Sequence, residues 1–208
     1  MSQPPPLQIR GLTRSFAQAV VLDGLDLDVA AGERVALRGP NGSGKTTLLR
    51  CVAGTLAPTD GDVRVGGHAA GTRGARQLLG ASLSQERSFY LRLTGGDNLR
   101  FFARVRGLGT AQADAAVASL EEELELATIS ARRVDRCSTG MVQQLAFARA
   151  LIGDPSLLLL DEPTRSLDEG AVSRLWGALE RRSGLAVLIA THRKEDASRC
   201  ERELDLAR

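Results

Sequence analysis

The stretch Gly39-Pro40-Asn41-Gly42-Ser43-Gly44-Lys45-Thr46-Thr47 constrains the fold more than any other part of this 208-residue chain. It fits the glycine-rich phosphate-binding pattern G-x-x-x-x-G-K-[ST] at every position. The run before it, 34–37, is typical of a strand, and the run after it, 48–53, is typical of a helix. Because the motif requires a strand, a loop and a helix in this order, the sequence predicts a phosphate-binding loop rather than an ordinary glycine turn.

The residue types in this loop suit the capture of an anion. Glycines allow backbone N–H groups to turn toward phosphate oxygens, and the N-terminus of the following helix adds a partial positive charge. Lys45 is expected to contact the β- and γ-phosphates of a nucleoside triphosphate, and the Thr46 hydroxyl to bind Mg²⁺.

Composition limits the class of protein. With 43% apolar and 25% charged residues, the chain is typical of a soluble globular protein with a substantial core. The net charge of +2 gives no support for nucleic acid or an anionic lipid surface as a partner. The three cysteines, Cys51, Cys137 and Cys200, are widely spaced and odd in number, which favours a reducing compartment over a disulfide framework or a zinc site.

Targeting signals are not evident in the sequence. No apolar run approaches the ~18 residues of a membrane-spanning helix. Residues 1–6, Met-Ser-Gln-Pro-Pro-Pro, lack the charged start and apolar middle of a secretory signal, so we expect a flexible lead-in. The chain is therefore expected in the cytoplasm, where any membrane role would come through a partner.

The rest of the chain predicts alternating strands and helices. The expected strands are 7–12, 25–29, 63–65, 78–84 and 185–190, and the expected helices are 97–107, 111–127, 138–150 and 169–182. Residues 66–76 are expected to form a surface loop. The charge runs 121–123 and 132–133 predict either solvated faces or a docking surface for a partner. The strand-helix-strand order near the end favours a parallel sheet, and hence an α/β fold.

Two acidic residues end a continuous apolar run. Residues 157–160 are all leucine, which predicts a parallel strand buried on both faces, and Asp161 and Glu162 follow directly. Asp161 is expected to face the phosphate loop and to hold Mg²⁺ through water, and Glu162 to polarise a water that attacks the γ-phosphate. The alternative is a charged turn at a strand end. His192 also follows a strand, so it is better placed for chemistry than His68, which lies in a glycine-rich segment.

Three other features are less specific. Phe16 is either a core or hairpin residue, or a ring that stacks on a flat base. Gln85, at the end of an expected strand, has an amide suited to sensing a cation or water, though alone it is weak evidence. The segment 138–141 is either an ordinary helix cap or a second anion site.

Taken together, the motifs resemble the ATP-binding-cassette (ABC) ATPases over nearly the whole chain. The resemblance rests on the order of the phosphate loop, Gln85, the helix start at Ser138, the strand ending in Asp161 and Glu162, the turn 166–168 and His192. It implies a P-loop NTPase (RecA-like) parallel sheet core, with an N-terminal antiparallel β subdomain and a helical signature subdomain. One ABC ATPase domain would span residues 7–208, with the core at about 7–86 and 154–208 and the helical subdomain at about 87–153.

The resemblance also implies roles for individual residues, with ATP and Mg²⁺ as cofactors. The implied nucleotide-binding residues are Phe16, stacking on adenine, with Gly39, Pro40, Asn41, Gly42, Ser43, Gly44, Lys45, Thr46 and Thr47. The implied metal-binding residues are Thr46, Gln85 of the Q-loop and Asp161 of the Walker B motif. The implied catalytic residues are Lys45, the base Glu162 and the switch histidine His192. Ser138, Thr139, Gly140 and Met141 would form the signature that completes the partner's ATP site, and Asp168 would lie in the D-loop.

The signature departs from the usual L-S-G-G-Q form. Here the stretch is Cys137-Ser138-Thr139-Gly140-Met141, which keeps the serine and the second glycine only. This form, together with the segment 88–95 and Asn98-Leu99, is similar to export-type (ABC-2-like) ATPases that work with a separate membrane permease. The resemblance therefore implies an ATP-hydrolysing subunit that dimerises head to tail at the cytoplasmic face of the membrane and drives that permease.

Two other functions remain open at this point. The first is an ABC ATPase that acts as an assembly or mechanical factor outside transport. The second is a simple P-loop kinase, which would leave the signature segment and His192 without a function. The cargo of a transporter would bind the permease, so the sequence does not identify it.

Overall fold

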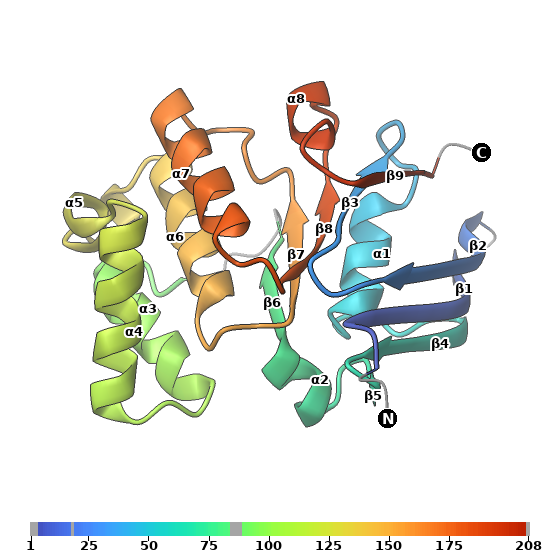
Figure 1. Ribbon diagram of the computed structural model, residues 1–208, viewed down its shortest axis with the longest axis horizontal. Coiled ribbons are helices and arrows are strands. Elements are labelled where there is room, and N and C mark those ends of the chain that lie inside the picture. The colour runs from blue at the N-terminus through green and yellow to red at the C-terminus, as the bar shows by residue number, and fades with distance from the viewer. Residues whose placement is uncertain (1–3, 18, 84–88, 207–208) are drawn as a thin grey trace. The chain divides into compact units, whose positions relative to one another are not determined.

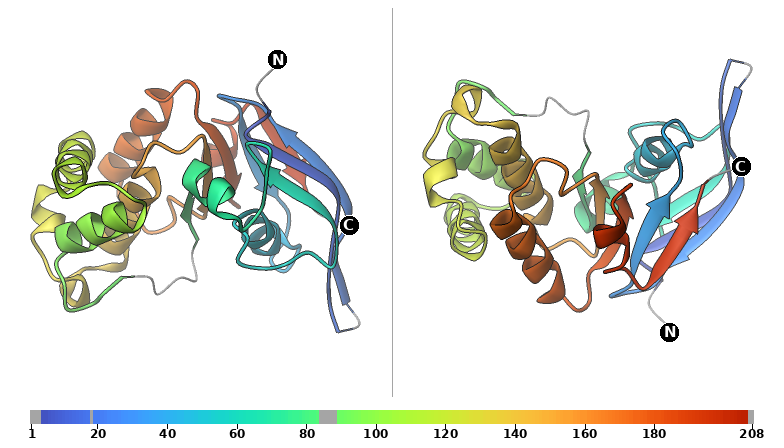
Figure 2. Two further views of the ribbon diagram at one scale, coloured as in Figure 1. Left: turned by 90° about the horizontal axis from the view of Figure 1, so that it is seen from below. Right: turned by 90° about the horizontal axis from the view of Figure 1, so that it is seen from above.

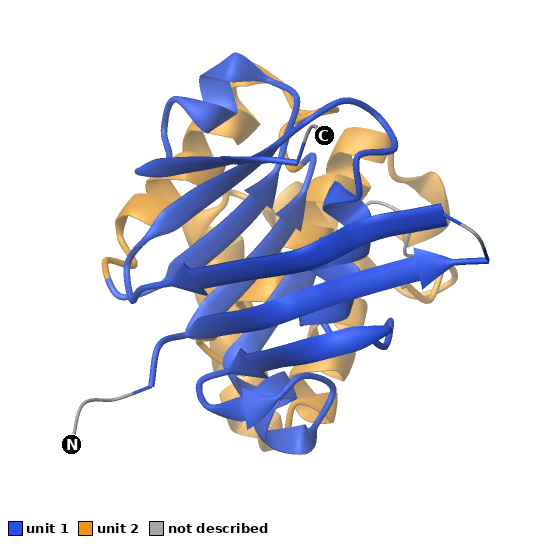
Figure 3. Cartoon of the chain, turned by 90° about the vertical axis from the view of Figure 1, so that its right-hand side faces the viewer, with its two compact units in different colours: residues 1–83, 156–162, 184–208 blue, residues 84–155, 163–183 orange. Residues whose placement is uncertain are grey.

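The computed structural model describes residues 4–17, 19–83 and 89–206. The chain divides into two compact units, coloured separately in Figure 3. The first unit comprises residues 1–83, 156–162 and 184–208, and the second comprises 84–155 and 163–183. The phosphate loop, Asp161, Glu162 and His192 belong to the first unit, whereas Ser138 and Asp168 belong to the second.

The first unit contains a five-stranded parallel sheet (Figure 1). Its strands are β3 (Arg34–Arg38), β6 (Leu79–Ser82), β7 (Leu157–Asp161), β8 (Ala186–Ala190) and β9 (Arg202–Asp205). Their spatial order is β6-β7-β8-β3-β9, and all neighbours are parallel. Every residue of β7 and β8 is buried, because continuous apolar runs suit strands that are covered on both faces. This confirms the expected parallel sheet.

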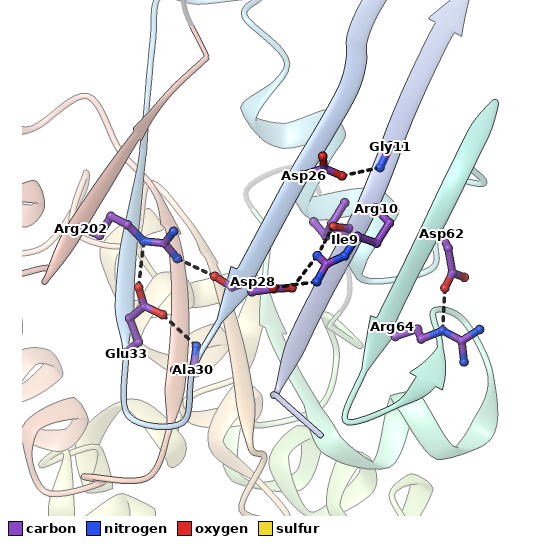
Figure 4. A network of polar contacts seen from close by, with 10 residues as sticks. All are labelled: Ile9, Arg10, Gly11, Asp26, Asp28, Ala30, Glu33, Asp62, Arg64 and Arg202. Carbon is purple, nitrogen blue, oxygen red and sulfur yellow. Dashed lines mark hydrogen bonds and ion pairs between the residues drawn. The ribbon is translucent and has the colours of Figure 1, made fainter. Parts of the chain in front are cut away.

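The end of the sheet was not predicted from the sequence, because the last expected strand was 185–190. The structure adds α8 (Lys194–Ala197) and the edge strand β9. Three of the four residues of β9 are charged, so it lacks the apolar alternation that marks a strand. Polar contacts hold it instead: Arg202 Nε lies 2.8 Å from Glu33 Oε1, and Arg202 Nη2 donates to the carbonyl of Asp28 (Figure 4).

The same unit contains a second, antiparallel sheet, in the order β2-β1-β4-β5. Its strands are β1 (Leu7–Phe16), β2 (Ala19–Val29), β4 (Asp60–Val65) and β5 (His68–Ala69). Helix α1 (Lys45–Val52) contacts β2 and β4 as well as β7 and β8, so it lies between the two sheets (Figure 2). The antiparallel subdomain is confirmed, and the phosphate loop leads into the helix that joins both sheets.

Three of the expected ranges in this unit were wrong. Strands β1 and β2 are longer than the expected 7–12 and 25–29, because they form one irregular hairpin with several register shifts. Residues 66–76 are not simply a loop: they contain β5 and most of α2 (Arg73–Leu78), whose first turn is capped by the Thr72 hydroxyl. A threonine just before a helical segment is the signal that could have revealed this helix.

The second unit is helical. It contains α3 (Gly95–Val105), α4 (Thr110–Glu123), α5 (Ala127–Ser130), the 3₁₀ turn η1 (Val134–Arg136), α6 (Thr139–Leu151) and α7 (Glu169–Glu180). The expected helix 111–127 is in fact two helices, since α4 ends at Glu123 and Glu125 has a left-handed φ of 54°. Buried apolar side chains, including Leu99, Val117 and Leu145, form the core of this unit.

Glu123 does not lie on a solvated face, which corrects one of the sequence expectations. Its carboxylate accepts hydrogen bonds from Arg182 at 2.7 Å and from Arg181 at 3.0 Å, and only 17% of its side chain is exposed. The bond from Arg182 is the main reason that the pKa of Glu123 is lowered from its ordinary value. The pair therefore links the end of α4 to the residues that follow α7.

We expect Glu123→Gln to lower the free energy of unfolding by about 1–2 kcal/mol at neutral pH, because it leaves Arg182 without its charged acceptor. The folded state has the lower pKa, so this stabilisation is present above the pKa of the unfolded chain and is lost as pH falls through the folded value. Urea denaturation of both proteins between pH 3 and about 7 measures it. The exposed Glu122→Gln is the control, and an equal effect of both changes would contradict the assignment.

In the described part of the chain, no helix has both the length and the apolar character needed to cross a bilayer.

Candidate functional site

Three strands end side by side in the parallel sheet. Ala190 of β8 is in register with Asp161 of β7 on one side and with Leu37 of β3 on the other. The phosphate loop follows β3, Glu162 follows β7 and His192 follows β8, so these segments leave the sheet at the same edge. In parallel α/β sheets, the carboxyl edge is where ligands bind.

The phosphate loop has the backbone that its glycines permit. Gly39, Gly42 and Gly44 have φ values of 138°, 85° and 99°, a region that side chains other than glycine rarely adopt. Gly44 is the N-cap of α1, whose first turn has neither a side-chain cap nor an acidic residue. The first backbone N–H groups of a helix have no partner within the helix, so this end of α1 suits an anion.

Lys45 lies within the same loop. Its Nζ donates to the carbonyl oxygens of Gly39 at 2.7 Å and Pro40 at 2.9 Å. The ammonium group is therefore folded over the loop. When a phosphate binds, its anionic oxygens would take the place of these carbonyl oxygens as the acceptors of the Lys45 hydrogen bonds. Charge-assisted hydrogen bonds of that kind are stronger than those to neutral carbonyls.

Asp161 and Thr46 are the candidate metal ligands that lie together. The Thr46 hydroxyl donates to Asp161 Oδ2 at 2.9 Å, and Asp161 is only 3% exposed. Among the described residues, no three His, Cys, Asp or Glu side chains cluster around a possible metal position. Mg²⁺ commonly takes one or two protein oxygens and completes its shell with phosphate and water. A hydroxyl and a carboxylate at the phosphate loop fit that requirement.

Glu162 and His192 form the second pair at this edge. His192 Nδ1 lies 2.8 Å from Glu162 Oε2. Oε2 is buried and accepts no hydrogen bond from the described residues. Glu162 also has a φ of 49°, an uncommon value for a residue other than glycine. An uncommon φ together with a buried carboxylate oxygen that accepts no hydrogen bond is typical of a functional site.

Two residues behind His192 were given no role from the sequence. Thr191 is fully buried, and its hydroxyl accepts from the backbone N–H of Arg193 at 3.1 Å and donates to Asp196 Oδ2 at 3.2 Å. These bonds close a short turn around His192 and hold it to α8. Asp196 lies in a charged segment, so its own sequence context does not single it out. The threonine that directly precedes His192 was the one signal in the sequence for this pair.

Phe16 is not a core residue. It is 43% exposed at the end of β1, and the guanidinium carbon of Arg14 lies 4.5 Å from its ring centroid. The register of the hairpin pairs Phe16 with Ala19 and Arg14 with Leu22. A Cβ built on Gly44 would lie 3.0 Å from Leu22 Cδ2, so this part of β2 packs against the phosphate loop.

The signature and D-loop residues lie in the helical unit. Ser138 is the N-cap of α6, and its hydroxyl accepts from the N–H of Met141 at 3.2 Å. Asp168 is the N-cap of α7, and its carboxylate accepts from the N–H of Ala171 at 2.8 Å. Ser138 and Thr139 are exposed, whereas Gly140 and Met141 are partly buried. The cap at Ser138 is therefore observed, and the expected anion contact remains a prediction. Gln85 lies outside the described residues.

We expect Gly140→Ala to destabilise the start of α6, because a Cβ at this position would overlap the carbonyl oxygen of Ser166. The collision is with backbone, which cannot move as a flexible side chain does, so a loss of about 1–3 kcal/mol is expected. Thermal denaturation measures it. Thr139→Ala is the matched control on the exposed surface, and equal stability of the two variants would contradict the steric argument.

The fold and this edge define a nucleotide-binding domain of the P-loop NTPase class. A sequence model of the family described as "ABC transporter" matches residues 22–165. The chain belongs to the ABC transporter family.

Individual relatives agree with this assignment. The chain is 37% identical to "Nod factor export ATP-binding protein I" of Rhizobium meliloti (strain 1021), over 94% of this chain and 60% of that protein. It is 34% identical to "Fe(3+) ions import ATP-binding protein FbpC 1" of Haemophilus influenzae, over 95% and 61%. A solved ATP-binding subunit of an ABC transporter has a TM-score of 0.88 at 27% identity, over 96% of this chain and 85% of that one. This chain thus spans about three fifths of the length of those two sequence relatives.

Proposed function

We propose that this chain binds ATP with Mg²⁺ at the phosphate loop and hydrolyses it to ADP and phosphate. The observation that carries the proposal is the convergence at one sheet edge of Lys45, the Thr46–Asp161 pair and the Glu162–His192 pair. Each pair matches a need of phosphoryl transfer: neutralising charge, holding the metal and orienting water.

The residues would act as follows. Backbone N–H groups of residues 41–47 and the Lys45 ammonium would bind the β- and γ-phosphates. Thr46 and Asp161 would hold Mg²⁺, with Gln85 as a further ligand, and the bound metal would supply positive charge that neutralises the phosphates. Glu162 Oε2 accepts a hydrogen bond from the attacking water and orients it. His192, held through Thr191, contacts the γ-phosphate.

We further propose that two copies associate head to tail when ATP is bound. The phosphate loop and the signature residues 138–141 lie in different units, and the exposed Ser138 at the N-terminus of α6 offers donors for an anion. The γ-phosphate on one copy would be contacted by the signature of the other, and Asp168 would lie at the same interface. ADP with released phosphate holds the copies less well, so hydrolysis separates them.

A separate integral membrane permease is the proposed partner, with the ATPase at its cytoplasmic side. The name of the Rhizobium relative supports export, whereas that of the Haemophilus relative describes import, so direction rests on the S-x-G-M signature form. Exposed apolar side chains support docking of the permease on the region that follows Gln85. The side chains of Tyr90, Leu91, Leu93, Phe101 and Val105 are 38–66% exposed, and the rings of Tyr90 and Phe101 contact each other with centroids 4.9 Å apart. Large exposed apolar patches mark interaction sites.

Copurification tests the partner. The tagged chain, extracted from membranes in mild detergent, is expected to recover a polytopic membrane protein. Replacing Leu91 and Val105 with serine should reduce that recovery and leave ATP hydrolysis by the isolated chain intact. Recovery of soluble proteins alone would instead favour an assembly factor.

A further inference from the structure

The contact between Arg14 and Phe16 has no role in the ATP site as proposed above. Both residues lie on β1, two positions apart, and the register of the hairpin shifts between Arg14 and Ser15. The guanidinium carbon of Arg14 lies 4.5 Å from the ring centroid of Phe16, well within the range of a cation–π contact. Arg14 therefore covers one face of a ring that remains 43% exposed.

Arg14 is held in this position by its surroundings. Its Nη1 donates to the carbonyl oxygen of Ala57 at 3.0 Å, which ties the guanidinium to the loop before β4. Its charge also acts on Cys51 of α1, where it opposes the rise in the pKa of that thiol caused mainly by burial. The guanidinium thus lies between β1, α1 and the loop at Ala57.

The position of the Arg14 side chain carries a cost in folding free energy. Its Nε is buried, and no described residue accepts a hydrogen bond from it. A buried donor without an acceptor is unfavourable, and such groups in a folded protein call for an explanation. The contact with Phe16 accounts for this position, because the guanidinium carbon lies over the ring at 4.5 Å from its centroid.

The hairpin register places the Phe16 ring on the same part of the hairpin that packs against the phosphate loop. Arg14 is paired with Leu22, which packs against Gly44 of the phosphate loop, and Phe16 lies two residues further along β1. A nucleotide whose phosphates lie at the start of α1 can therefore extend its base toward the end of this hairpin.

We propose that Arg14 is a positioning residue for the base-binding ring of Phe16. It occupies one face of the ring, limits the rotation of the side chain, and presents the other face to adenine. The cation also draws π-electron density toward itself, which favours stacking with an electron-rich base on the opposite face. This inference rests on the proposed ATP site.

A double-mutant cycle tests the proposal. The variants are Arg14→Met, which keeps an unbranched side chain without the charge, Phe16→Ala, and the double change. Calorimetric titration with Mg-ATP and with Mg-tripolyphosphate, which has no base, gives the affinities. We expect Arg14→Met to weaken ATP binding about fivefold, to leave tripolyphosphate binding unchanged, and to have no further effect once Phe16 is absent.

A purely structural role for Arg14 predicts different results. If Arg14 only ties β1 to Ala57, its replacement should lower the affinities for ATP and tripolyphosphate equally, or lower the ATP affinity by the same factor with and without Phe16. Either result overturns the proposal. Arg14→Lys keeps the cation and should recover part of the lost ATP affinity even if Arg14→Met is poorly folded. A wild-type chain that binds neither ligand would reject the ATP site itself, which is a separate failure.

Discussion

Replacing Glu162 with glutamine is expected to lower the rate of ATP hydrolysis by about 10²–10⁴-fold, the usual contribution of a positioned general base. The buried Oε2 lies 2.8 Å from His192 Nδ1 and accepts no hydrogen bond from the described residues, so it can accept one from a water. Glutamine keeps the size and the left-handed backbone of this position. The fold and ATP binding should therefore persist.

The same variant should accumulate as an ATP-bound dimer, because hydrolysis is the step that releases the two copies. Phosphate release measures turnover, and size-exclusion chromatography with light scattering measures the dimer in Mg-ATP. Glu122→Gln, on an exposed helix face, is the matched control. Near-normal turnover in Glu162→Gln would remove this residue from the mechanism.

Replacing Lys45 with alanine is expected to weaken ATP binding by about 10–100-fold, the range for loss of hydrogen bonds to a charged group. In the described structure, Lys45 Nζ donates to two carbonyl oxygens of the loop at 2.7 and 2.9 Å. The ammonium therefore already lies over the loop that would bind the phosphates. Isothermal calorimetry measures the affinity. Lys194→Ala, which removes the chain's other lysine from an exposed position, is the control. Unchanged affinity in Lys45→Ala would refute the role of the loop.

Much of the candidate site was predictable because its signals are local. The phosphate loop is a contiguous motif, and Asp161 and Glu162 directly follow a run of four leucines. Parallel strands bring their carboxyl ends to one edge, which favoured His192 over His68 as a functional residue. In the structure His192 Nδ1 lies 2.8 Å from Glu162 Oε2.

Other features depend on residues that are far apart in the sequence or lack a local pattern. Arg182 and Glu123 are separated by 59 positions, so their ion pair was invisible to a pattern of charges along one helix. The mostly charged strand β9 is specified by pairing with β3 and by contacts to Glu33 and Asp28, not by its own residues. The contact of Arg14 with Phe16 required the strand to be long enough to include both.

The central claim is that each ATP is bound by the phosphate loop of one copy and the signature of another. Mixing two inactive chains, Lys45→Ala and Ser138→Arg, tests it directly. In a head-to-tail dimer of one copy of each, one site contains an intact Lys45 and an intact Ser138. Equal mixing should therefore recover about a quarter of wild-type ATP hydrolysis, since half of the dimers are mixed and each has one intact site. If both residues served the same copy's ATP, every site would stay defective, and the mixture would be as inactive as its components.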